Sequence, residues 1–174
     1  MNENSDASAA AGELVPWALG EFEKPLMGYA YGLLKDAEHA RDVVQDAFIK
    51  LCRQDPEPDR DLVKAWLFTV CRNRALDLIK KNSKMIATDT IALDVNASEH
   101  PSPAQRAIQC DAHGQAMALM NLLPANQREA IRLRFQSDLS YREIAEVMEI
   151  SVSNVGFLLH TGLRRLRDQL QASD

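Results

Sequence analysis

The sequence predicts an all-α protein of two small helical domains joined by a flexible linker, the second domain containing a helix-turn-helix. Only seven glycines and seven prolines occur among 174 residues, which is typical of helical chains. Apolar residues recur at helical spacing along most of the chain, and no alternating strand pattern is visible. Residues 84–102 lack this periodicity and end in HPSP, so they are expected to form the linker.

The first domain is expected over residues 13–83, after a small, polar tail at 1–12 that is expected to be disordered. Apolar spacing predicts three helices, at about Leu14–Leu34, Ala37–Arg53 and Asp61–Asn82. The second helix is amphipathic, with an apolar stripe of Val43, Val44, Ala47, Phe48 and Leu51. Pro56 and Pro58 separate it from the third helix, because proline removes a backbone donor and disfavours helix in the residue before it.

The second domain is expected over residues 103–174. A helix is predicted at about Pro103–Leu122, Pro124 marks a turn, and another helix covers Ala125–Phe135. The segment LSYREIAEVMEISVSNVGFLLHTGLRRLRDQL follows with the spacing of a helix-turn-helix, which places its second helix in the DNA major groove.

Within this segment, two steeply crossing helices need a small residue where they touch, and Ala145 supplies it. The shared core is expected to contain Ile144, Met148, Ile150, Val155 and Leu158. Ser151 is a good N-cap for the second helix, predicted from about Val152 to Leu170. The same apolar spacing also fits an ordinary helical hairpin; DNA binding is favoured by the basic run of Arg164, Arg165 and Arg167.

The net charge of −5 is unevenly distributed. Residues 1–12 hold two acids and residues 85–103 hold three, with no Lys or Arg, which accounts for the whole excess. Residues 64–84 carry six bases against one acid, whereas residues 13–63 carry six bases against eleven acids. This division favours one face for a polyanion and another for a different partner.

Several function classes find no support in the sequence. No apolar run approaches a membrane span and no signal-peptide pattern occurs, so a cytoplasmic protein is expected. Cys52, Cys71 and Cys110 are far apart and lack metal-ligand spacing, which favours three buried, reduced thiols. The chain has no Gly-rich phosphate loop, and its four histidines are scattered, so neither an enzyme nor a cofactor is expected.

The third predicted helix has an unusual polar face. On a helical wheel, Lys64–Lys84 presents one apolar face and one face of Trp66, Thr69, Asn73, Asp77, Lys80 and Lys84, flanked by Arg72 and Arg74. An aromatic ring among cations suits single-stranded nucleic acid, because an unpaired base can stack on the ring while the cations hold phosphates. Alternatively, the lysines complement the helix dipole and Trp66 caps the core edge or packs on another domain.

Together these segments resemble the sigma-70 family, specifically the small extracytoplasmic-function (group-four) sigma factors. LLKDAEHARDVVQDAFIKL resembles the polymerase-binding helix, and KAWLFTVCRNRALDLIKK resembles the promoter-melting helix. LPANQREAIRLRF resembles the start of the domain that reads the −35 element, and the helix-turn-helix completes that domain. The resemblance covers about residues 14–84 and 104–170, in family order.

For the first domain, the resemblance implies polymerase binding and recognition and melting of the −10 element. The polymerase contacts it implies are Asp42, Gln45, Asp46 and Phe48, although a merely solvated acidic face would also explain the two carboxylates. The loop Gln54–Val63 is assigned to base choice. The residues implied in capture of the −10 strand are Trp66, Arg72, Asn73, Lys80 and Lys81. Asp77 fits a structural role better, because a carboxylate would repel phosphates.

For the second domain, the resemblance and the helical wheel place the −35 contacts at Arg142, Ser153, Asn154, Phe157, His160, Arg164 and Arg165. Phe157 can touch a thymine methyl group or serve as a contact for another protein or domain. Glu149 stands where relatives usually place a glycine in the tight turn, so this turn is either strained or differently shaped. Few cations line the second helix, so the isolated domain is expected to bind promoter DNA weakly.

The resemblance therefore implies a transcription initiation factor whose partners are core RNA polymerase and promoter DNA. An anti-sigma factor is a further candidate partner, and the linker 84–102 would let the domains close on each other or around it. The alternative is a stand-alone helix-turn-helix regulator with a helical sensory domain. That alternative leaves the acidic helix and the Trp-bearing basic helix unexplained.

Overall fold

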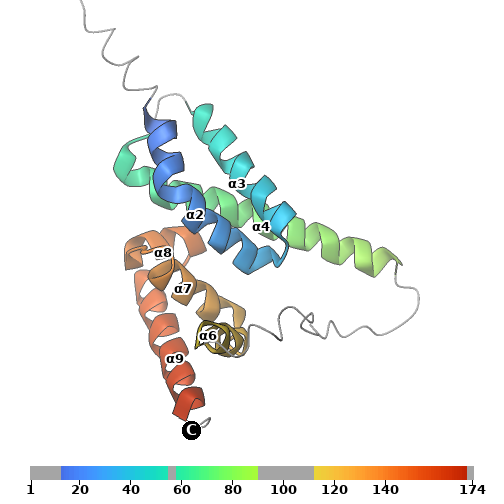
Figure 1. The fold of residues 1–174 in the computed structure, drawn as a ribbon, viewed down its shortest axis with the longest axis vertical. Helices are drawn as coiled ribbons and strands as arrows, with labels where there is room; N and C mark the ends of the chain where they lie inside the picture. The colour runs from blue at the N-terminus through green and yellow to red at the C-terminus, as the bar shows by residue number, and fades with distance from the viewer. Residues whose placement is uncertain (1–12, 55–57, 90–111, 172–174) are drawn as a thin grey trace, which may run out of the picture.

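The computed structural model describes residues 13–54, 58–89 and 112–171. The described chain is helical without a strand, which confirms the all-α prediction. The predicted tail at 1–12, the first residues of the predicted helix at 103, and most of the predicted linker lie outside the described residues. Figure 1 shows two helical groups packed against each other.

The first group comprises α2 (Leu14–Leu34), α3 (Ala37–Cys52) and α4 (Arg60–Asp89). Asp36 caps α3 by accepting the backbone N–H of His39 at 2.8 Å. The whole predicted apolar stripe of α3 is buried, and it packs on α2 and α4. These three helices enclose the core of the first domain, in which Leu26, Val43 and Phe68 are at most 1 % exposed.

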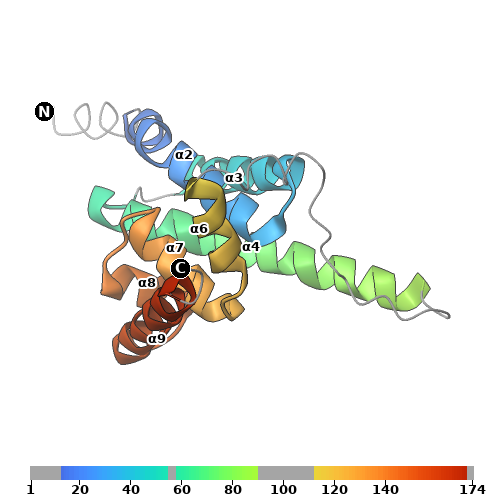
Figure 2. The ribbon, with the colours of Figure 1, turned by 60° about the horizontal axis from the view of Figure 1, so that its bottom comes forward.

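Helix α4 is longer than the sequence predicted, ending at Asp89 instead of Asn82. The segment after Asn82 loses its apolar periodicity, but it contains neither glycine nor proline to end a helix. The later turns of α4 extend beyond the body of the molecule in both ribbon views (Figures 1 and 2). Residues 84–89, which were assigned to the linker, are thus helical.

The second group comprises α6 (Ala112–Asn121), α7 (Ala125–Phe135), α8 (Tyr141–Met148) and α9 (Val152–Gln171). A capping box starts α8: Ser140 Oγ accepts the N–H of Glu143, whose carboxylate accepts the N–H of Ser140. Ser151 caps α9 by accepting the N–H of Asn154 at 3.2 Å, as predicted. The predicted core residues are buried, apart from the half-buried Ile150.

The turn between α8 and α9 is strained, one of the two outcomes that the sequence left open. Glu149 has φ 56° and ψ 44°, which is the left-handed region. Its N–H bonds to the carbonyl oxygens of Ala145 and Glu146 and so ends α8. A glycine would adopt this conformation without a steric cost.

The two groups form one packed body, in which α8 lies against α4 (Figures 1 and 2). The hydrophobic core continues from one group to the other. Hydrogen bonds from side chains of α2 and α4 cross to α7 and to the loop after it. The second domain therefore sits directly on the helix that the sequence assigned to strand capture.

Candidate nucleic-acid interface

The residues predicted to capture the −10 strand all lie on α4, but the fold places them in two different settings. Asn73, Lys80 and Lys81 are exposed, and the two lysines belong to the later turns of the helix. Trp66 and Arg72 lie nearer its start and are half-buried. The structure thus keeps one part of the predicted set open to solvent and covers the other part.

Trp66 combines a packing role with partial exposure. Its ring packs against the hydrophobic core but is not sealed inside it. Among its neighbours on the predicted face, Thr69 is half-buried and its hydroxyl donates to the carbonyl oxygen of Ala65 at 2.8 Å. The indole therefore marks the edge of the core, which was one of the two interpretations of this residue, and its remaining exposure leaves base stacking available.

Arg72 is engaged by the second domain. Its Nε donates to Oε1 of Glu129 on α7 at 2.8 Å, and the two side chains are 16 % and 11 % exposed. Burial alone would lower the pKa of Arg72, but the hydrogen bond and the negative charge of Glu129 outweigh it and raise this pKa. The guanidinium stays charged and its partner in this structure is a carboxylate.

The same Glu129 carboxylate also binds α2. The hydroxyl of Tyr29 donates to Oε1 of Glu129 at 2.7 Å. Burial, with the charge of Glu129 adding to it, raises the pKa of Tyr29 well above its usual range, so the phenol remains a donor. One carboxylate of the second domain thus joins two helices of the first.

Arg132, one turn further along α7, makes a second link. It is 3 % exposed and donates from Nη1 to the carbonyl oxygen of Gly32 on α2 at 2.6 Å. Burial and the nearby charge of Arg128 lower the pKa of Arg132. Its Nη2 is buried without a hydrogen-bond partner among the described residues, so this contact is made at a desolvation cost.

The predicted polymerase-binding residues all lie on α3, but they differ in exposure. Asp42 and Gln45 are exposed, and Asp46 is half-buried and pairs with Arg74 Nε of α4 at 3.1 Å. Phe48 is only 6 % exposed and belongs to the core, because it shares the apolar stripe of the helix. The exposed members of this predicted set are therefore polar, and Phe48 packs in the core beneath them.

The predicted −35 residues lie on the helix-turn-helix, and all are exposed. Phe157, a large apolar residue, is 63 % exposed. Arg165 already has a hydrogen-bond partner within the domain, since its Nη1 donates to Gln127 Oε1 at 3.1 Å. Arg164 lies 4.0 Å from Asp168, which offsets its charge locally.

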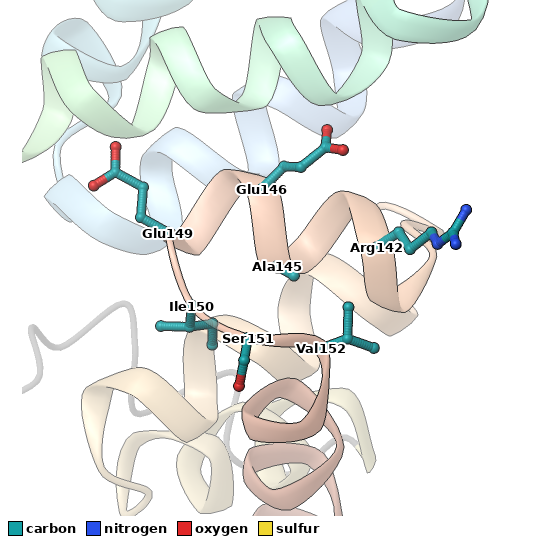
Figure 3. A pocket seen from close by; sticks show the side chains of 7 residues that line it. All are labelled: Arg142, Ala145, Glu146, Glu149, Ile150, Ser151 and Val152. Atoms are coloured by element: carbon teal, nitrogen blue, oxygen red, sulfur yellow. The ribbon is translucent and has the colours of Figure 1, made fainter.

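The turn of the helix-turn-helix borders an open pocket of about 520 Å³ (Figure 3). Its lining consists of Arg142, Ala145, Glu146, Glu149, Ile150, Ser151 and Val152. In Figure 3 the side chains of Glu146 and Glu149 leave the backbone on the side of α4, whereas Ser151 points toward α9. A pocket with two carboxylates and one guanidinium is a poor site for a phosphate, so this hollow adds little to DNA binding.

Sequence reasoning missed Glu129 and Arg132. They stand three residues apart on α7 and therefore share a face, which was the available signal. That signal says only that the face is polar, and it does not identify the domain that covers it.

For metal sites, the described part of the chain holds no group of three His, Cys, Asp or Glu side chains that could ligate an ion. None of its helices is long and apolar enough to cross a membrane.

The chain is similar to known proteins over both domains. Residues 20–85 match the family description "Sigma-70 region 2", and residues 113–166 match "Sigma-70, region 4". The ECF RNA polymerase sigma factor SigM of Bacillus subtilis is 31 % identical over 144 residues, which cover 80 % of this chain and 84 % of SigM. The ECF RNA polymerase sigma factor SigL of Mycobacterium tuberculosis is 32 % identical over 175 residues, covering 98 % and 97 % of the two chains.

Two solved structures share the fold. The sigma factor RpoE of Bartonella quintana, crystallised with the anti-sigma factor NepR, superposes with a TM-score of 0.65 at 21 % identity and covers 97 % of this chain and 99 % of that one. CnrH, in complex with the cytosolic domain of CnrY, gives 0.66 at 22 % identity, covering 97 % and 96 %.

Proposed function

This chain belongs to the sigma-70 family, and we propose that it binds core RNA polymerase and directs it to promoters by melting a −10 element and reading a −35 element. The observation that carries the proposal is the occurrence of both family regions in one chain, at residues 20–85 and 113–166. As a transcription initiation factor it leaves the covalent chemistry to the polymerase. It acts in the cytoplasm, where its polymerase works.

The first domain performs strand capture and polymerase binding. Asn73, Lys80 and Lys81 are exposed on α4 and supply a polar group and two cations for the displaced strand. Trp66 adds a partly exposed ring for base stacking, and Arg72 adds a cation once Glu129 has released it. On α3, the exposed Asp42 and Gln45 are the polymerase contacts, with Asp46 at their edge.

The second domain reads the −35 element with the exposed face of α9. Asn154 can pair with an adenine edge and Phe157 can contact a thymine methyl group. His160 and Arg164 are exposed further along the same helix and supply phosphate contacts. Because Arg164 and Arg165 are partly satisfied by Asp168 and Gln127, this domain binds DNA weakly by itself.

An anti-sigma factor is a further proposed partner, since one of the two solved structures reported above is a complex with the anti-sigma factor NepR. The exposed Phe157 is a candidate contact for it. Removing this ring with Phe157→Ala would then relieve inhibition, whereas a pure DNA role would lower transcription in the absence of any inhibitor.

The experiment that tests the function is promoter-specific run-off transcription with core polymerase. Wild-type protein should yield discrete transcripts that core polymerase alone does not produce. The double variant Lys80→Ala/Lys81→Ala should reduce them, and it should lower the salt dependence of promoter binding by about one charge for each lysine. Lys24→Ala, at an exposed lysine of α2, is the matched control.

The same experiment distinguishes the proposed function from that of a stand-alone regulator. Such a protein would bind duplex promoter DNA tightly without polymerase and would not give core polymerase any promoter preference. Absence of specific transcripts together with nanomolar duplex binding would overturn the proposed function.

A further inference from the structure

We propose that the second domain closes over α4 in the free protein and that Glu129 holds Arg72 where a DNA phosphate would otherwise bind. Domain closure and single-strand capture then exclude each other. This inference rests on the proposed function of α4, and it adds a resting state in which the chain blocks its own DNA site.

The first argument is the chemistry of the contact. Arginine binds carboxylates and phosphates with the same donors, since both are compact anions with adjacent oxygens. Glu129 offers Arg72 such an anion at 2.8 Å, in a setting where both side chains are mostly shielded from water. A phosphate can reach the same guanidinium Nε only after Glu129 has left.

The second argument is that the closed arrangement includes a close contact at a glycine of α2. Arg132 reaches the carbonyl oxygen of Gly32 because this position of α2 carries no side chain. A Cβ atom at Gly32 would lie 2.9 Å from Cζ of Arg132, so the guanidinium, the movable end of that side chain, would have to shift and give up this hydrogen bond. Gly28, one turn earlier on the same helix, has nothing within 4 Å of such an atom.

The third argument is charge. Besides Glu129, the basic helix α4 meets a neutral backbone carbonyl group and a second carboxylate of the second domain. Lys64 donates to the carbonyl oxygen of Asp138, in the loop before α8. Glu149 adds a negative charge that acts on Arg72, and Figure 3 shows its side chain on the α4 side of the turn. The carboxylates among these groups give α4 a negative electrostatic potential, as a nucleic-acid backbone would.

The interface is also able to open. The links at α7 are hydrogen bonds and one ion pair, and one guanidinium nitrogen of Arg132 remains unsatisfied among the described residues. Apolar contact adds to these links, since the hydrophobic core continues from one group to the other, so opening has to be driven by a partner. A partner that binds the open form more tightly, such as core polymerase, would therefore shift the population toward it.

The test uses the full chain without polymerase. Small-angle X-ray scattering gives the radius of gyration, and fluorescence anisotropy gives the affinity for a fluorescein-labelled single strand of mixed sequence. Gly32→Ala should enlarge the radius of gyration and tighten single-strand binding by about fivefold or more, the low end of coupling between two sites. Gly28→Ala should change neither quantity. Alanine favours helix over glycine, so neither variant weakens α2 itself.

A charge exchange tests the same contact independently of Gly32. Glu129→Arg should expand the molecule by placing two cations against each other. Adding Arg72→Glu should restore the compact radius, because the pair is then rebuilt with its charges exchanged. Helical content from circular dichroism verifies that each variant is folded, and a variant that has lost it is replaced by the milder Glu129→Gln.

The results separate this inference from the proposed function. A wild-type protein that scatters as an extended molecule overturns the closed state, and so does a Gly32→Ala variant that expands without gaining single-strand affinity. Either result leaves promoter-specific run-off by the wild type intact. Conversely, a failed run-off assay with a compact wild type overturns the proposed function but not the closure.

Discussion

Gly162 of α9 lies so close to Ile131 of α7 that a Cβ atom on the glycine would come within 2.8 Å of Ile131 Cδ1. The two helices touch where an added methyl group has no room, since it would also lie 3.4 Å from Gln127 Cβ. This contact fixes α9 against α7 and thereby sets the position of the proposed recognition face.

We expect Gly162→Ala to destabilise the second domain. The added methyl group overpacks a close contact, which costs roughly 1–3 kcal/mol, and the gain in helix propensity of about 1 kcal/mol offsets only part of it. Urea unfolding followed by circular dichroism should show a lower midpoint for this variant.

Gly156→Ala is the matched substitution on the same helix, with the opposite expected sign. The nearest atom to its Cβ would be Tyr141 Cε2 at 3.9 Å, which is an ordinary contact. The variant should therefore gain up to about 1 kcal/mol in the free energy of unfolding from helix propensity. Equal effects at the two glycines would show that the contact with Ile131 is not tight.

Glu149→Gly should stabilise the protein by relieving the left-handed turn. A non-glycine residue in this conformation costs roughly 1–2 kcal/mol. The greater conformational freedom of glycine in the unfolded chain cancels about half of the stability gained. Glu149→Ala removes the same carboxylate but keeps the Cβ atom, so it should not stabilise. If both variants were equally stable in urea unfolding, strain at this turn would be excluded.

The sequence predicted those features that depend on neighbours in the chain. The start of α9, its Ser151 cap and the apolar stripe of α3 follow from local periodicity and capping chemistry, and the structure has them. The end of α4 was placed too early, because loss of apolar spacing was taken as loss of helix. A segment without regular apolar spacing can stay helical where neither glycine nor proline interrupts it.

The candidate site was predicted less completely, because a helical wheel does not identify what covers a face. Asn73 and Lys80 are exposed as the wheel predicted, and so is Lys81, which only the family resemblance had assigned to this site. The partner of Arg72 is Glu129, 57 residues away in the chain, and no local pattern links the two. Phe48 was assigned to the polymerase surface by motif, although its place on the apolar stripe already indicated burial.

Ser140→Ala should weaken the start of the helix-turn-helix. The substitution removes the acceptor of the Glu143 N–H in the capping box, and loss of such a cap costs about 1 kcal/mol. Thermal unfolding should show the loss. Ser153→Ala, at an exposed serine within the first turn of α9, lacks this capping role and should be neutral or slightly stabilising. A Ser140→Ala protein as stable as the wild type would mean that Glu143 alone suffices to start α8.

Cys71 should resist alkylation for as long as the first domain stays folded. The side chain is fully buried, and burial raises the pKa of its thiol to about 12, so the reactive thiolate does not form at neutral or moderately alkaline pH. Cys52 was expected to be buried like the other two cysteines, but it is exposed at the end of α3 and should react quickly. In a Cys110→Ser background, mass spectrometry after iodoacetamide treatment at pH 8 should find one modified cysteine in the native protein and two in urea. Rapid native modification of Cys71 would contradict a packed α3–α4 core, since the thiol lies beside the carbonyl oxygen of Val43 in that core.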